Sequence, residues 1–156
     1  MTKQEALPLH FFIGLFSLVA LVAQLVVIPQ VGATYASKYP EVAYLEPLYV
    51  TALVVALVGL EVALLSAWQL VSAAVTGRAL SAWPTRWTNI MTASLIFMAA
   101  ICAGVCVHAG FVASVGGPAM LFGLLLSLAL IPVAFALRHW VRGWLRNENV
   151  HAVSAS

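Results

Sequence analysis

The chain has 156 residues, of which 63% are hydrophobic and 8% are charged, and its mean hydropathy is +1.04. A soluble domain is about 45–50% apolar and about 25% charged, so these few charges cannot cover a water-facing surface. The composition therefore predicts an integral membrane protein. The net charge is only +2 and the cations are scattered along the sequence, which excludes the clustered basic footprint of a nucleic-acid-binding protein.

Four apolar runs are long enough to be membrane spans. A bilayer core about 30 Å thick takes about 20 apolar residues in a helix, because only the helix's own hydrogen bonds satisfy its backbone in lipid. The predicted spans are residues 9–31, 48–75, 90–113 and 118–144. We expect a single all-α domain, an integral membrane four-helix bundle, with an outer loop at 33–47, a cytoplasmic loop at 76–89 and a polar tail at 147–156.

The cations that flank the spans predict the orientation. If the four spans alternate, Lys38 lies alone on one side and the other cations fall on the opposite side, namely Lys3, Arg78, Arg86, Arg138, Arg142 and Arg146. Lys and Arg near span ends are retained in the cytoplasm, so we expect both termini there. The tyrosines lie in or beside the outer loop and the tryptophans lie toward the inner side, as two interfacial belts would require.

Glu61 is the one acidic residue well inside a predicted span, where an ionised carboxylate is costly. Gln24 also lies well inside its span, in a stripe with His10 and Ser17, and antiparallel packing could bring it to Glu61. One hypothesis makes Glu61 a proton or cation relay. The other, which we favour, makes it a neutral carboxyl hydrogen-bonded to Gln24, worth about 0.6–2 kcal/mol of interhelical stabilisation. A relay needs several titratable groups in series, and only Glu61 lies at mid-depth.

No cofactor, metal or catalytic site is predicted. His10 and His139 lie near the cytoplasmic ends of the outermost spans, so they could be axial haem ligands, but imidazoles at span ends also settle at the interface. Cys102 and Cys106 lie four residues apart in an apolar run and lack the second ligand pair that zinc requires, so we expect two small packed residues. No nucleophile–base pair or phosphate-binding loop is present, so we expect no enzyme.

A basic stripe predicts contact with lipid. Arg138, Arg142 and Arg146 recur every four residues as the fourth span leaves the membrane. Such a stripe suits anionic headgroups on the cytoplasmic side, where each cation contributes about 1 kcal/mol.

Two further features predict contact with other membrane-protein subunits. Ala100 and Gly104 are small residues at four-residue spacing in the third span, which let another helix backbone approach closely. The outer loop is rich in tyrosine, an aromatic residue enriched at interface hot spots, and Tyr39 and Tyr44 are the candidate anchors.

Residues 23–91 carry a family resemblance through the stretches AQLVVIPQV, YPEVAYLEPLYVTALVVALVGLEVALLSAWQLV and GRALSAWPTRWTNIM. They are similar to the actinobacterial branch of a four-span bacterial membrane family known as domain of unknown function 2975. The residues that match its pattern are Gln24, Pro29, Trp68, Arg86 and Ile90. The sequence departs from the family where RNENVHAVSAS replaces an acidic helix and where Leu80-Ser81 replaces an aromatic-Ser pair.

The resemblance implies a four-helix membrane protein with no catalytic residues to carry over. Some branches are paired with a small helix-turn-helix regulator, an implication that the missing acidic tail weakens here.

We therefore expect a non-catalytic accessory or structural subunit of a larger bacterial plasma-membrane complex. The most specific hypothesis is an energy-transducing respiratory complex, although no residue points to respiration. The alternative is a stand-alone regulatory or transport-related membrane protein with Glu61 as a possible proton relay. A transporter would show internal repeats and broken helices, which this sequence lacks apart from Pro132.

Overall fold

The computed structural model describes residues 3–76, 83–114 and 117–154. Every element in these ranges is helical, and no strand occurs in them. The elements are α1 (Lys3–Val22), the π turn η1 (Ala23–Val27), α2 (Ile28–Lys38), the 3₁₀ segment η2 (Pro40–Leu45), α3 (Glu46–Val75), α4 (Trp83–Val107), the π turn η4 (His108–Val112) and α5 (Pro118–Ser154). The predicted all-α class is confirmed.

Four helical stretches are long and apolar enough to cross a membrane. They are Ala6–Lys38, Pro40–Val75, Trp83–Val112 and Pro118–Trp144. The shortest has 27 residues, which at 1.5 Å per residue is about 40 Å, more than the roughly 30 Å of a bilayer core. These dimensions fit a multi-pass membrane protein.

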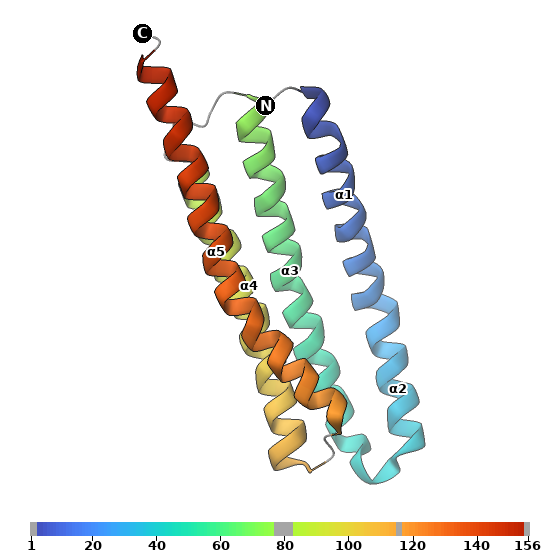
Figure 1. Cartoon of the computed structure of the whole chain (residues 1–156). Helices are drawn as coiled ribbons and strands as arrows, with labels where there is room; N and C mark the ends of the chain where they lie inside the picture. Colours follow the sequence, from blue (N-terminus) through green and yellow to red (C-terminus); the bar gives the residue numbers. More distant parts are fainter. Residues whose placement is uncertain (1–2, 77–82, 115–116, 155–156) are drawn as a thin grey trace.

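The helices form an open row. α1, η1 and α2 make one long rod that packs antiparallel on α3, α3 packs on α4, and α4 packs on α5, which lies in front of α4 in Figure 1. Within the described residues, α1 contacts neither α4 nor α5, and α3 does not contact α5. A closed bundle would bring the first and last helices together, so the arrangement is more open than the predicted four-helix bundle.

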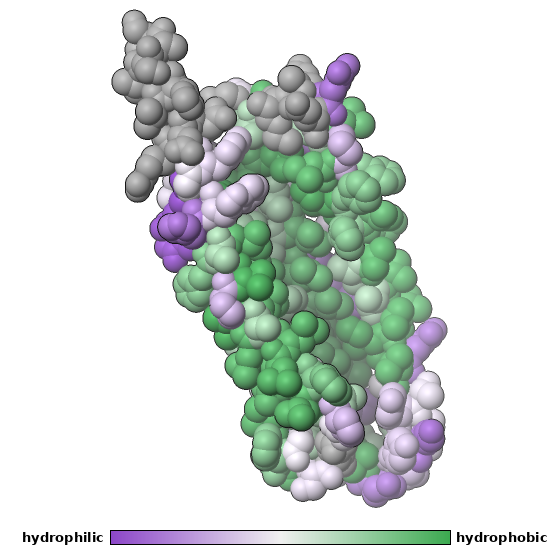
Figure 2. Space-filling view, viewed as in Figure 1, coloured by the Kyte–Doolittle hydropathy of each residue, from purple (hydrophilic) through white to green (hydrophobic). Residues whose placement is uncertain are grey.

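The molecule has two ends along the direction of its helices. α1 begins and α5 ends at the same end of the molecule, here called the terminal end, and η2 lies at the opposite end, here called the loop end (Figure 1). An even number of spans requires this arrangement. Hydrophilic surface gathers at both ends, and an apolar band lies between them on the face seen in Figure 2.

The α3–α4 contact is close because small residues line it. A Cβ atom placed on Gly59 would lie 3.1 Å from the Ser94 carbonyl oxygen and 3.2 Å from Phe97 Cδ1, so only glycine fits without a shift. Buried hydroxyls in this contact are satisfied within their own helices. The Ser66 hydroxyl donates to the Val62 carbonyl at 2.7 Å, the usual way for a membrane helix to bury a hydroxyl.

The helices extend beyond the predicted spans. The predicted outer loop 33–47 is largely helical, since α2 runs to Lys38 and η2 begins at Pro40, and the predicted polar tail continues α5 as far as Ser154. Part of the predicted loop 76–89 belongs to α4, and residues 77–82 lie outside the described ranges.

A π turn breaks the first predicted span. In η1 the Ile28 N–H donates to the Ala23 carbonyl, five residues back. Pro29 follows directly, and proline cannot donate to the carbonyl four residues before it, so the ordinary α pattern is already interrupted here. The wider turn lets the rod continue through Pro29.

Candidate functional site

Polar side chains of α1, η1 and α3 lie along the contact between these helices, here called the polar seam and defined by His10, Gln24, Glu61 and Ser72. Glu61 is included because it lies seven residues before Trp68, which packs on His10, and so shares that side of α3. At the terminal end of the seam, His10 Nδ1–H donates to the Ala6 carbonyl at 2.9 Å, and in the neutral ring Nε2 then accepts from the Ser72 hydroxyl at 3.1 Å. The Trp68 ring packs edge-on against His10 with centroids 4.4 Å apart. His10 is therefore fully engaged by neighbouring groups.

The two histidines considered as axial ligands are not brought together. His139 is exposed on α5, and α5 does not contact α1 within the described residues.

Gln24 and Glu61 do not form the predicted pair. Gln24 Nε2 donates to the Val54 carbonyl at 3.4 Å, while its Oε1 is buried without a hydrogen-bond partner. Val54 and Glu61 are seven residues apart, which is about 10 Å along the axis of α3. Because His10 lies against Ser72 and Gln24 against Val54, the antiparallel register places Glu61 opposite residues 17–21, toward the end of α1. The hydrogen-bond partner of Gln24 is therefore the Val54 carbonyl and not the Glu61 carboxyl.

Glu61 is thus left without its expected donor. Its Oε1 is buried and accepts no hydrogen bond, although the side chain as a whole is only half-buried. Two acceptor oxygens in one seam, those of Gln24 and Glu61, therefore lack donors. Unpaired polar atoms in hydrocarbon cost free energy, so each is a candidate binding position.

A second polar contact lies at the loop end and was missed by the sequence analysis. The Tyr49 hydroxyl lies 2.9 Å from His108 Nδ1, with the rings 5.8 Å apart and nearly perpendicular, and the pair joins the start of α3 to η4. Both residues lie near the outer ends of predicted neighbouring spans, which was the available signal. His108 is the first residue of the π turn η4, which no sequence pattern announces.

The terminal end of the α4–α5 pair holds the predicted basic residues. Arg142 Nη2 donates to Asn89 Oδ1 at 2.8 Å. Arg138 Nε is buried and has no acceptor. Arg146 belongs to α5, but its side chain lies outside the described part of the structure.

The predicted partner residues are all exposed. On α4, Ala100 and Gly104 point away from the other helices, and a Cβ on Gly104 would meet nothing within 4 Å. At the loop end, Tyr39 stacks on Tyr35 with centroids 6.2 Å apart, and Tyr44 is 73% exposed. These residues are therefore available to other molecules.

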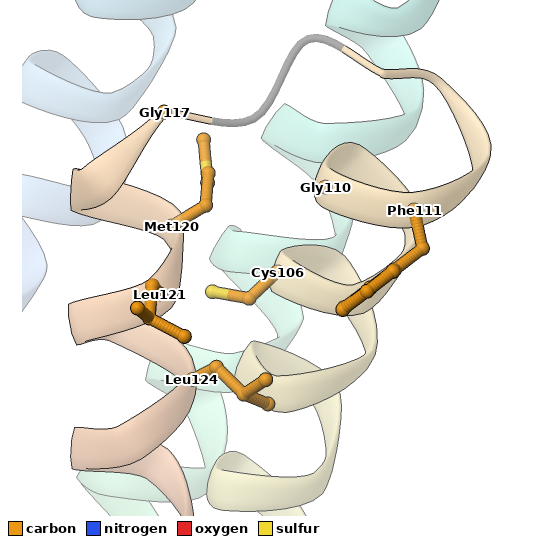
Figure 3. Close-up of a pocket in the computed structure, with 7 residues that line it drawn as sticks. All are labelled: Cys106, Gly110, Phe111, Gly117, Met120, Leu121 and Leu124. Carbon is orange, nitrogen blue, oxygen red and sulfur yellow. The ribbon is translucent and has the colours of Figure 1, made fainter.

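Two apolar hollows lie between α4 and α5, and the two free cysteines line them. The smaller, about 120 Å³, is bounded by Cys106, Gly110, Phe111, Gly117, Met120, Leu121 and Leu124, and its Cys106 sulfur points toward α5 (Figure 3). The larger, about 380 Å³, includes Cys102 and Ser127 in its wall. Among the described residues no group of three or more His, Cys, Asp or Glu side chains is placed to hold a metal ion.

Comparisons with protein-family models, with curated proteins and with solved structures gave no match to this chain. The resemblance to domain of unknown function 2975 therefore stays a prediction from the sequence.

Proposed function

We propose that this chain is a non-catalytic accessory subunit of a larger protein complex in a bacterial plasma membrane. The observation that supports it best is the outward face of α4. The side of α4 that faces α3 is closely packed, with Ser94 and Phe97 against Gly59 of α3. Ala100 and Gly104, by contrast, present an open surface of α4 to the surroundings. Close backbone approach favours another helix over lipid at such a surface.

The open row supports the same proposal. Within the described residues, α1 packs on α3, and α5 packs on α4 and on η4, so both outer helices keep broad exposed faces. Phe111 and Leu126 are 78% and 75% exposed, and Tyr44 is exposed at the loop end. These surfaces offer protein contacts both within the membrane and at its edge.

Affinity purification in mild detergent, followed by mass spectrometry, tests the proposal. We expect a reproducible membrane-protein partner with the wild-type chain, and the partner's identity decides whether the complex is a respiratory one. Gly104→Leu should reduce recovery of that partner at least several-fold, because leucine prevents close backbone approach.

Matched variants distinguish the outward face of α4 from the loop end as the surface that binds the partner. Gly143→Leu places the same side chain at another open glycine, on α5, and should leave recovery unchanged. Tyr39→Ala combined with Tyr44→Ala tests the loop end. Undiminished recovery in the Gly104 and tyrosine variants, or no partner for the wild type, would contradict the accessory-subunit proposal.

The second candidate function is proton transfer through the polar seam, and the unpartnered buried Oε1 of Glu61 favours it. Its test is acidification of proteoliposomes under an imposed potential. A flux abolished by Glu61→Gln and retained by Glu61→Asp would support a relay, whereas a flux equal to that of empty vesicles would exclude one.

A further inference from the structure

Arginines from two helices gather at the terminal end of the α4–α5 pair. The hydrogen bond from Arg142 to Asn89 fixes α5 against α4 at this level. Arg86 lies three residues before Asn89 and Arg138 lies four before Arg142, so each is on the same side of its helix as that hydrogen bond. We call Arg86, Arg138 and Arg142 the arginine cluster. Strongly hydrophilic surface is visible toward this end of α5 in Figure 2.

The cluster lacks a counter-charge among the side chains that the structure describes. Glu41 and Glu46 lie at the loop end, and Glu61 lies in the middle of α3. Arg138 Nε is buried without any acceptor. A buried guanidinium N–H needs an acceptor, and three arginines in this region suit an anion with several oxygens.

Apolar surface adjoins the cluster on the side toward the middle of the molecule. Phe135 lies three residues before Arg138, and Leu128 lies seven before Phe135, so both share the helix face of the arginines, and each is 49% exposed. From Arg138 to Leu128 is ten residues, about 15 Å, which matches one leaflet of a bilayer core. A ligand that uses both regions has an anionic head and an apolar tail.

We propose that the arginine cluster binds the phosphate of an anionic phospholipid whose acyl chain lies along Phe135 and Leu128. The cations come from two helices, so the lipid bridges α4 and α5, and its phosphate oxygens supply the acceptor that Arg138 lacks. A soluble anion would make no use of the exposed apolar surface at Phe135 and Leu128. A zwitterionic lipid brings its own cation, which competes with the arginines. This site joins Arg138 and Arg142, two members of the predicted stripe of Arg138, Arg142 and Arg146, to a second helix through Arg86 and Asn89.

The test is native mass spectrometry of the full chain in non-ionic detergent with added phosphatidylglycerol, phosphatidylcholine of the same acyl chains, or inorganic phosphate. We expect the chain to retain phosphatidylglycerol in preference to phosphatidylcholine. In a separate thermal-unfolding measurement, we expect the chain to unfold at a higher temperature when phosphatidylglycerol is present. At about 1 kcal/mol per cation, Arg86→Gln should weaken binding about 5-fold, and Arg86→Gln with Arg138→Gln about 30-fold. Lys38→Gln, at the loop end, should change nothing.

Each outcome bears on the proposal. Arg86 is exposed, so the single variant should fold normally, and circular dichroism without lipid checks this. Equal retention of the two lipids, or wild-type selectivity in a folded Arg86→Gln variant, would overturn the lipid site. Saturation by inorganic phosphate with loss of lipid selectivity would replace it with a soluble-anion site.

Discussion

Glu61 and Gln24, two side chains of the polar seam, differ in the hydrogen bonds that they make. Gln24 donates to the Val54 carbonyl and so ties η1 to α3, whereas Glu61 Oε1 is buried with no donor. A hydrogen bond between membrane helices contributes about 0.6–1.7 kcal/mol, and an unpaired buried acceptor destabilises the fold. Through its hydrogen bond to the Val54 carbonyl, Gln24 stabilises the contact between the first rod and α3. Glu61 Oε1 makes no hydrogen bond that would stabilise this contact.

The first prediction compares leucine at these two positions. Gln24→Leu should lower the free energy of unfolding by at most about 0.6–1.7 kcal/mol, because the hydrogen bond to α3 is lost while the buried, unpartnered Oε1 is removed with it. Glu61→Leu should leave it unchanged or raise it, because an unpartnered carboxyl is replaced by an apolar group of similar size. Thermal unfolding of the purified variants in one detergent measures both effects. A large loss of stability for Glu61→Leu would show that a donor holds this carboxyl, as the glue hypothesis requires.

Among the helical elements, α4 uses its two sides differently. One side is fitted to α3 so tightly that Gly59 cannot accept a Cβ without a shift, and the other carries Ala100 and Gly104 with nothing against them. Small residues therefore have two roles in this chain, internal close packing and an external flat surface. The identity of the residues does not separate the roles, but the free space around each glycine does.

The second prediction separates these roles by stability. Gly59→Leu should reduce the free energy of unfolding of the isolated chain by at least about 1–3 kcal/mol, because overpacking forces α3 away from α4. Gly104→Leu should leave that stability nearly unchanged, since a Cβ there meets open space. Denaturation of both variants in detergent, followed by circular dichroism, makes the comparison. Equal destabilisation by the two substitutions would contradict the proposed division of α4.

On the scale of the whole molecule, the open row with both termini at one end leaves one binary choice, namely which end faces the cytoplasm. Lys38 lies at the loop end, and the arginine cluster lies at the terminal end. The positive-inside rule therefore predicts that the terminal end is cytoplasmic.

The third prediction tests this orientation by labelling. Single cysteines placed at residues 38 and 78, in a background without Cys102 and Cys106, are treated with an impermeant maleimide in intact cells. We expect labelling at residue 38 only, with residue 78 labelled after the membrane is permeabilised. Residue 78 lies outside the described ranges, so we add Thr76→Cys, directly after the end of α3, and expect it to be labelled under the same conditions as residue 78. Labelling at 76 and 78 but not at 38 would reverse the orientation.

The amino-acid sequence by itself determined the all-helical class and the four long apolar helices. Lipid leaves the backbone no partner except itself, so an apolar run of sufficient length has one stable conformation. The sequence also placed His10, Ser17 and Gln24 on one side of the first span, because a 3.6-residue repeat brings residues seven apart to the same face of a helix.

Only the tertiary structure decided the register and the openness of the helices. Gln24 lies against Val54 and not Glu61, Tyr49 meets His108, and Arg142 reaches Asn89. Each pairing depends on an axial offset of a turn or two, about 5–10 Å, which a hydropathy average over about 19 residues cannot resolve. The offsets follow from side-chain fit, such as the close approach at Gly59, and from the π turns, whose extra residue rotates every side chain that follows.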